Sequence, residues 1–285
     1  MKLCQFFKGN ALHIGVPDGD RILDVTAMGR REGVLIPADI DAFIAIGDLG
    51  TLGGILETSP IYAEEGSIKY APVVRNPQKI LCAGANYADH IKEAGMQLPK
   101  VPVMFSKFNN SLNGHDCEVE LINTAEQYDY EAELVAVIGK RGKFIPEDRA
   151  SEYVFGYTCG NDLSARDVQI ITTQYLMGKS FDGMCPIGPY LVTADSIDVS
   201  DLAIRARING EVRQSSSTGH LIFTVTKLLS YASQYMTLEP GDIILTGTPG
   251  GVIFGYPPEK QVWLKKGDVV EVEIDGIGTL RNKMA

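Results

Sequence analysis

The feature that most constrains the fold is an alternating run, YDYEAELVAVI, at positions 128–138. Every even position of this run is apolar, while Asp129, Glu131 and Glu133 fill consecutive odd positions. The period of two predicts a β-strand with three carboxylates on one face. Because alternate side chains of a strand point the same way and lie roughly 6.6 Å apart, these like charges repel and raise each other's pKa. A divalent cation among them would remove the repulsion.

A solvated strand face is the simpler interpretation of such a pattern. In this chain, however, the odd face continues into Val135 and Val137. Glu131 and Glu133 therefore stand where the strand enters the interior of the protein. This position favours a metal site over a solvated surface.

Composition and charge exclude several classes of function. The formal net charge of −10 argues against binding of nucleic acid or of an anionic membrane through a basic surface. The five cysteines are scattered and include no Cys-x-x-Cys pair, so neither a zinc knuckle nor a disulfide framework is indicated. Only five residues separate Lys2 from Lys8, which is too short for the apolar region of a signal peptide, and no segment approaches a membrane-spanning length. We expect a soluble, cytoplasmic protein.

The sequence divides into two parts near residue 71. The first part, residues 1–71, is predicted to form a small N-terminal α+β module. The extended, proline-containing segment that follows opens a larger part, residues 72–285. Within the first part, the predicted elements are strands near 2–7, 12–15 and 21–24 and a helix near 40–46.

The larger part is dominated by short β-like runs. Residues 203–208 alternate and then meet Asn209-Gly210, a strong hairpin signal. Residues 242–246 and 268–274 are predicted to be further strands, and residues 221–235 have the length and apolar spacing of a helix. Because strands and helices do not alternate regularly, the predicted fold class is α+β rather than a doubly wound sheet.

Two glycine-containing segments fail the spacing of nucleotide-binding motifs. Residues 47–54 lack the dinucleotide fingerprint and are predicted to be a loop. Residues 178–180 are similar to the end of a phosphate-binding loop, but the upstream glycine is missing. Three histidines have no second ligand at the sequence spacing of a metal site: His13, His115 and His220. We expect each of them to be structural or exposed.

Asp162 is the clearest third oxygen ligand for the cation expected at Glu131 and Glu133. It begins a probable turn into a helix, so it could equally cap that helix. Three carboxylates suit Mg²⁺ or Mn²⁺, which keep coordination positions open for water and substrate oxygens. An open position of this kind is what a Lewis-acid catalyst requires.

His90 and Glu93 form a second candidate pair within residues 86–93. Three residues apart on a helix, they would share one face. The carboxylate could then orient the imidazole and raise its basicity, leaving the other ring nitrogen to take a proton from water. An exposed helical His–Glu pair without chemical role is the alternative.

Seven segments carry a resemblance to a known family. They are GANYADHIKE, DYEAELVAVIGK, NDLSARDVQ, GKSFDGMCPIGP, INGEVRQ, LTGTPGGV and KKGDVVEVEIDGIGTLRN. In this order they resemble the signature blocks of the fumarylacetoacetate hydrolase family over residues 72–285. The resemblance implies a mixed β-roll or β-sandwich catalytic domain, usually a homodimer, to which many members add an N-terminal module.

The resemblance also implies roles for individual residues. His90 and Glu93 match the water-activating dyad of the family, and Lys179 matches a lysine beside the metal and the substrate. Lys179 would neutralise negative charge that develops on the substrate. The positions that match the ligands of Mg²⁺ or Mn²⁺ are Glu131, Glu133 and Asp162.

Three further residues match polar positions near the substrate, namely Arg166, Gln169 and Thr248. Arg166 could instead belong to a structural ion pair. Thr248 could instead stabilise the turn that precedes Pro249. Their roles as substrate contacts are expectations from the resemblance.

We expect a metal-dependent hydrolase that cleaves a carbon–carbon bond in a small anionic 2,4-dioxo acid of the acylpyruvate or fumarylpyruvate type. The same chemistry could decarboxylate oxaloacetate, or isomerise or tautomerise an unsaturated 2-oxo diacid such as a hydroxymuconate. Only hydrolysis strictly needs activated water, so the presence of both His90 and Glu93 favours it. A non-catalytic metal-binding protein is the remaining alternative. Residues 86–99 could close over the substrate as a lid.

Overall fold

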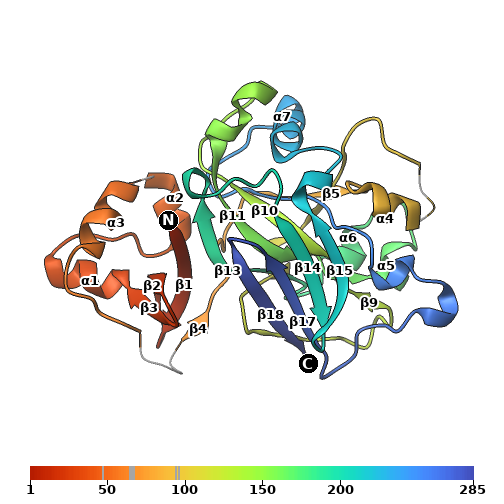
Figure 1. The fold of residues 1–285 in the computed structure, drawn as a ribbon, viewed down its shortest axis with the longest axis horizontal. Coiled ribbons are helices and arrows are strands. Elements are labelled where there is room, and N and C mark those ends of the chain that lie inside the picture. The colour runs from red at the N-terminus through yellow and green to blue at the C-terminus, as the bar shows by residue number, and fades with distance from the viewer. Residues whose placement is uncertain (47, 64–67, 94, 96) are drawn as a thin grey trace.

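The computed structural model describes residues 1–285 with the exception of 47, 64–67, 94 and 96. Within these residues the chain folds as α+β, as predicted, with one large sheet, one five-stranded sheet, one two-stranded sheet and short helices (Figure 1). No helix in the described part of the chain reaches the length and apolar character that a bilayer crossing requires.

The described residues of the range 1–70 form a layer of strands with helices beside it (Figure 1, red to orange). The predicted strands and the helix at 40–46 are confirmed. The loop predicted for 47–54 is wrong, because a helix begins after Asp48, whose carboxylate accepts a hydrogen bond from the Thr51 N–H at 3.1 Å; residue 47 lies outside the described residues. The elements are β1 Lys2–Lys8, β2 Ala11–Asp18, β3 Arg21–Asp24, α1 Val25–Glu32, α2 Ile40–Ile46, α3 Leu49–Leu56 and β4 Lys69–Tyr70.

The large sheet runs through both parts of the chain, in the order β3-β2-β1-β13-β11-β10-β16-β5-β6. The junction is β1, which pairs antiparallel with β13 through Lys2 and Val192. One sheet therefore includes strands from both sides of the boundary proposed near residue 71. The boundary stays a prediction. The other strands of this sheet are β5 Ile80–Gly84, β6 Val103–Lys107, β7 Leu112–Asn113, β10 Ala132–Ile138, β11 Val154–Asn161, β13 Cys185–Thr193 and β16 Ile243–Leu245.

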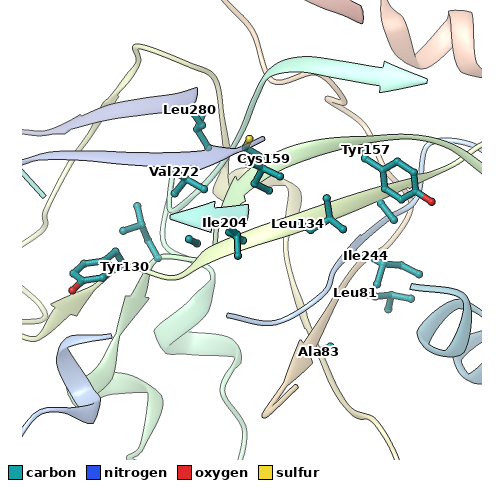
Figure 2. Close-up of a cluster of buried hydrophobic side chains, with 14 of the residues drawn as sticks. Leu81, Ala83, Tyr130, Leu134, Tyr157, Cys159, Ile204, Ile244, Val272 and Leu280 are labelled. Atoms are coloured by element: carbon teal, nitrogen blue, oxygen red, sulfur yellow. The ribbon is translucent and has the colours of Figure 1, made fainter. Parts of the chain in front are cut away.

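A five-stranded sheet, in the order β15-β14-β17-β18-β8, packs against one face of the large sheet. Figure 2 shows the core between them, where Leu134 of β10 and Cys159 of β11 lie near Ile204 and Val272. Asn209 and Gly210 adopt positive φ in the turn between β14 and β15, as the hairpin signal predicts. The strands are β8 Glu118–Val119, β14 Ala203–Ile208, β15 Glu211–Ser217, β17 Val269–Ile274 and β18 Gly278–Met284.

Strand β10 is buried on both faces. Leu134 and Ala136 belong to the core between the two sheets, whereas Val135 and Val137 belong to the core that β10 shares with the N-terminal helices. The prediction that this strand enters the interior is confirmed. The strand consequently carries Glu133, its second residue, into a buried position.

The remaining elements are the two-stranded sheet and the α-helices α4 to α7. Helix α7 begins after Thr224, whose hydroxyl caps it by accepting from the Lys227 N–H, and it lies within the predicted range 221–235. The small sheet β9–β12 and the short helices α4, α5 and α6 lie at the right of Figure 1. Their bounds are α4 Ala88–Glu93, β9 Tyr128–Asp129, β12 Ser164–Ala165, α5 Arg166–Gln169, α6 Leu176–Lys179 and α7 Val225–Tyr235.

Candidate active site and metal centre

Antiparallel pairing of β10 with β11 brings two of the predicted metal ligands together. Ala132 lies opposite Asn161 in this register, so the next pair outward is Glu131 with Asp162. The Asp162 N–H donates to the Glu131 carbonyl oxygen at 3.0 Å, and the Asn161 side chain accepts from the Glu131 N–H at 3.0 Å. Asp162 directly follows the last residue of β11, and the cap position of the next helix, α5, is Ala165, so Asp162 does not cap that helix.

The side chains of Glu131, Glu133 and Asp162 converge. One carboxylate oxygen from each lies within 4.8 Å of the other two, and all three residues are buried. Oxygen donors alone suit a hard cation such as Mg²⁺ or Mn²⁺. Asp129, the third carboxylate of the alternating run, lies apart from this group because the strand is interrupted between β9 and β10.

Glu133 is the carboxylate whose surroundings most clearly call for a cation. Its Oε2 accepts from the Gly247 N–H at 2.6 Å, and no cationic side chain of the described residues pairs with it. Burial, followed by the charges of Asp162 and Glu131, raises the pKa of Glu133 well above its usual range. A buried carboxylate with two acidic neighbours is stable in its charged form only beside a positive charge. The residues therefore fit a divalent ion.

Two buried lysines hold the other carboxylates. The Lys179 ammonium, at the end of α6, lies 2.7 Å from Glu131 Oε2 and 2.8 Å from Asp162 Oδ2. Lys107, the last residue of β6, lies 2.6 Å from Asp162 Oδ1. Burial works against the Lys179 charge, but Asp162 and Glu131 outweigh it and raise the pKa of the ammonium. The lysine predicted beside the metal site is thus in contact with two of the ligands.

Arg166 forms the structural ion pair that the sequence left open as an alternative. Its guanidinium donates to Asp129 Oδ2 at 2.9 Å, to Glu131 Oε1 at 2.6 Å and to Gln169 Oε1 at 2.9 Å. Asp129 also accepts from the backbone N–H groups of residues 253 and 254. The guanidinium therefore fixes Glu131, and Arg166 and Gln169 still line the cavity described below.

Thr248 accepts a hydrogen bond from Gln214, a residue for which the sequence predicted no role. The Gln214 amide, on β15, donates to Thr248 Oγ1 at 2.8 Å and to the Pro249 carbonyl oxygen at 2.8 Å, while its own oxygen accepts from the Ala132 N–H. Because the Thr248 hydroxyl accepts in this bond, its own proton is available for a further hydrogen bond, and Thr248 lines the cavity described below. Gln214 thus links the loop of residues 246–250 to the start of β10.

His90 and Glu93 do not form the predicted hydrogen bond. Glu93 Oε2 accepts instead from the Gly251 N–H at 2.8 Å, and a Cβ added to Gly250 or Gly255 would approach the Glu93 carboxylate within 3.0 Å. In the part of the chain that the structure describes, His90 Nδ1 is buried and has no hydrogen-bond partner. Burial is the largest of the effects that lower the pKa of His90, so the imidazole is neutral near pH 7.

Most of the predicted site residues meet at one cavity of about 300 Å³. Its walls also include apolar side chains, among them Val103, Phe105 and Phe254. Glu93 and Asp162 lie outside its lining. The predicted site residues that line the cavity are His90, Glu131, Glu133, Arg166, Gln169, Lys179 and Thr248.

Sequence reasoning missed three buried polar residues that build this site: Lys107, Gln214 and Asn86. The Asn86 amide donates to the carbonyl oxygens of Phe223 and Thr246, which anchors the segment that precedes α4. Asn86 lies in the segment GANYADHIKE and Gln214 in the segment INGEVRQ, and this position within the motifs could have indicated a role in the site. Lys107 is the last residue of β6 and lies in none of the seven segments, so nothing in the sequence pointed to it.

The remaining sequence expectations concern residues outside the cavity. His13 bonds to Asp24 at 2.7 Å, and the nitrogen atoms of His115 and His220 bond to Arg281 and Ser216, so none contributes to the site. All five cysteines are free. Of the predicted lid, residues 94 and 96 lie outside the described residues, while Gln97 and Pro99 line the cavity; movement of this segment stays a prediction.

Comparison with known proteins identifies the family. The family model described as fumarylacetoacetate (FAA) hydrolase C-terminal matches residues 79–285. The protein named oxaloacetate tautomerase fahd2, mitochondrial, of Xenopus laevis is 39% identical over 292 residues, which cover 99% of this chain and 89% of the relative.

Two solved structures show the same fold over the whole chain. Fumarylacetoacetate hydrolase from Exiguobacterium antarcticum is 35% identical with a TM-score of 0.85, covering 100% of this chain and 99% of that one. Maleylpyruvate hydrolase from Sphingobium is 28% identical with a TM-score of 0.81 and the same coverage. With the buried acidic triad and the ordered motif blocks, these matches show that the chain belongs to the fumarylacetoacetate hydrolase family.

Proposed function

We propose that this protein interconverts the keto and enol forms of oxaloacetate or a closely similar 2-oxo diacid, with Mg²⁺ or Mn²⁺ as cofactor. The observation that carries the proposal is the state of His90, whose half-buried ring lines the acidic cavity with a buried, unbonded Nδ1 and no hydrogen bond to Glu93. A neutral imidazole in this position can accept a proton directly from a carbon acid. Similarity over nearly the whole chain to a protein named oxaloacetate tautomerase supports the same reaction.

Glu131, Glu133 and Asp162 would hold the metal ion through carboxylate oxygens. When bound, the ion would act as a Lewis acid that withdraws electron density from the 2-oxo group of the substrate. Asp162 and Glu131 are held by Lys107, Lys179 and Arg166, so their oxygens are in fixed positions before any ligand arrives. Fixed ligands reduce the reorganisation that binding would otherwise require.

The reaction is a net shift of one proton. In the direction from keto to enol, His90 takes a proton from C3, the C–H electron pair moves into the C2–C3 bond, and the 2-oxo oxygen gains a proton. His90 returns its proton to that oxygen directly or after exchange with water, so the atoms and charges balance. The Lys179 ammonium stabilises the negative charge that develops on the 2-oxo oxygen during the proton transfer.

The cavity offers further contacts to a small diacid. The Gln169 amide and the Thr248 hydroxyl line it, and each carries hydrogen-bond donors that suit a carboxylate. Its volume of about 300 Å³ lies at the lower end of the range for small-molecule sites. The apolar walls formed by Val103 and Phe105 would exclude water while the proton is transferred.

Carbon–carbon hydrolysis, which the sequence favoured, rested on a His90–Glu93 pair that activates water. The Glu93 carboxylate accepts from the Gly251 N–H instead of orienting His90. Support for hydrolysis from a water-activating pair is therefore weaker. Hydrolysis and decarboxylation nevertheless use the same cavity, and the experiment below distinguishes them from tautomerisation.

The test measures three reactions of the purified protein with Mg²⁺ or Mn²⁺. Loss of enol absorbance of oxaloacetate reports tautomerisation, pyruvate formation from oxaloacetate reports decarboxylation, and cleavage of an acylpyruvate reports hydrolysis. We expect tautomerisation to have the largest kcat/KM, to require the metal, and to fall on the order of 10²- to 10⁴-fold in His90→Asn. The matched control is His220→Asn, an exposed histidine, which should keep full activity. Faster acylpyruvate cleavage than tautomerisation would replace this proposal with the hydrolase.

Other expectations stay predictions. These are the homodimer and the cytoplasmic location; the Xenopus laevis relative is named a mitochondrial protein. The net charge of −10 continues to argue against a nucleic-acid partner. A small anionic substrate fits a site in which Lys179 and Arg166 are positively charged.

A further inference from the structure

A second cavity, larger than the one at the acidic triad, is lined by residues between Phe7 and Arg75. Its volume is about 780 Å³, and it shares no lining residue with the active-site cavity. This volume is within the range of small-molecule sites. The catalytic proposal makes no use of it.

The walls of this cavity, which we call the N-terminal cavity, are mainly apolar. Phe7 of β1, Leu12 of β2 and Phe43 of α2 contribute to them. Two further lining residues, Leu35 and Ile46, are 92% and 66% exposed. Exposed apolar side chains around a hollow are typical of a surface that a ligand covers.

Two arginines, Arg30 and Arg75, also line the N-terminal cavity. Among the residues that the structure describes, neither guanidinium has a carboxylate within ion-pair distance, although the chain carries ten more acidic than basic side chains. The Arg75 guanidinium instead lies over the Phe7 ring, 5.7 Å from its centroid. Both arginines are thus available to an external anion.

The nearby carboxylates are already engaged. Asp41 accepts from the backbone N–H groups of Arg75 and Asn76 at 2.8 to 3.1 Å. Asp48, which lines the cavity, caps α3 by bonding to the N–H and the hydroxyl of Thr51. These acids therefore serve the backbone and leave the two guanidinium groups without an internal counter-ion.

We propose that the N-terminal cavity binds an amphipathic monocarboxylate, of which a medium-chain fatty acid is the simplest example. The apolar tail would pack on Phe7, Leu12 and Phe43, and the carboxylate would accept from Arg30 and Arg75. A neutral apolar ligand would cover the guanidinium groups without satisfying them, which is costly. A short polar diacid would leave the apolar walls unfilled. The combination selects a molecule with one charged end and one apolar end.

Titration calorimetry with octanoate tests the proposal. Because octanoate could also enter the active site, the titration is made in the presence of excess Mg²⁺ and oxalate, which fill that site. We expect one octanoate per chain, with octanol binding at least tenfold more weakly because it lacks the charge. Arg75→Gln and Arg30→Gln should each weaken octanoate binding about tenfold, as loss of a charge-assisted hydrogen bond implies.

The matched control is Arg21→Gln, an arginine of the same module that lies over the Tyr62 ring and outside the cavity. This variant should bind octanoate like the unchanged protein. Arg30 is exposed, so its substitution leaves folding intact even if the Arg75 variant fails to fold. Equal affinity for octanol, unchanged affinity in both arginine variants, or no binding because a second copy covers the cavity would each overturn the proposal.

Discussion

The Lys107 Nζ atom lies 2.6 Å from Asp162 Oδ1, and neither side chain is exposed to solvent. The same ammonium donates to the carbonyl oxygens of Leu163 and Met184 at 3.0 and 2.8 Å, so all three of its protons are used. Lys107 thus binds Oδ1 of Asp162, whereas Lys179 binds Oδ2. This lysine supports the metal ligand without lining the cavity.

Replacement of Lys107 by Met should destabilise the metal-free protein by about 3–5 kcal/mol, since it leaves a buried carboxylate and two carbonyl oxygens without their donor. Urea unfolding measures this change. The control is Lys283→Met, an exposed lysine on β18 that lies 3.7 Å from Glu118 and should change stability by less than about 1 kcal/mol. Equal stability of the two variants would show that Lys107 is not needed to hold Asp162.

Replacement of Lys179 by Met should separate catalysis from metal binding. The ammonium lies between Glu131 and Asp162 but contributes no ligand, so its removal takes positive charge away from the metal site. We expect Mn²⁺ affinity to be retained or increased while kcat for oxaloacetate tautomerisation falls about 10²- to 10³-fold. Mn²⁺ titration followed by electron paramagnetic resonance and steady-state kinetics provide the two readouts. A parallel loss of metal and activity would assign Lys179 a structural role only.

The pH dependence of activity should report His90. Burial lowers its pKa below the usual 6.5, so the neutral ring persists as the pH falls past 6.5 and is lost only below the lowered value. The midpoint of the acidic limb of the activity profile should therefore lie below pH 6.5. Rates measured at constant ionic strength with saturating Mn²⁺ would show the profile. A decline that is complete above pH 6.5 would exclude His90 as the base.

The same shift has a consequence for stability. Below about pH 6.5 the unfolded chain binds a proton at His90, whereas the folded protein does not until the lowered pKa is reached. His90 therefore makes folding less favourable as the pH falls through this window. His90→Asn should flatten this part of the stability profile, which urea unfolding at several pH values would detect; an unchanged slope would contradict burial of a neutral ring.

Much of the fold could be predicted because local patterns agreed with the tertiary structure. The alternation of β10, the Asn209-Gly210 turn and the amphipathic helix α7 each encode their own geometry. Helix α3 was missed because its glycines, including Gly53 and Gly54, disfavour a helix intrinsically. Its cap at Asp48 and burial of its apolar side chains override that preference.

The metal ligands were also predictable, but their surroundings were not. Glu131 and Glu133 stand in one alternating run, whereas the bonds from Lys107 and Gln214 cross 55 and 82 residues of sequence. Such contacts depend on which strands become neighbours, and no local pattern specifies that. The partner of Glu93 was mistaken for the same reason, since Gly251 lies 158 residues away.

Glu93→Gln should decide between the two roles of Glu93. If its main function is to accept from the Gly251 N–H, the amide oxygen of glutamine can replace the carboxylate, so kcat/KM should fall less than about tenfold and the pH profile should keep its shape. Glu93→Ala removes the acceptor, frees the loop that carries Thr248, and should raise KM more strongly. Glu93→Gln could instead lower kcat/KM as much as Glu93→Ala and shift the acidic limb of the pH profile. That result would show that Glu93 orients His90 during turnover, as the dyad predicted from the sequence requires.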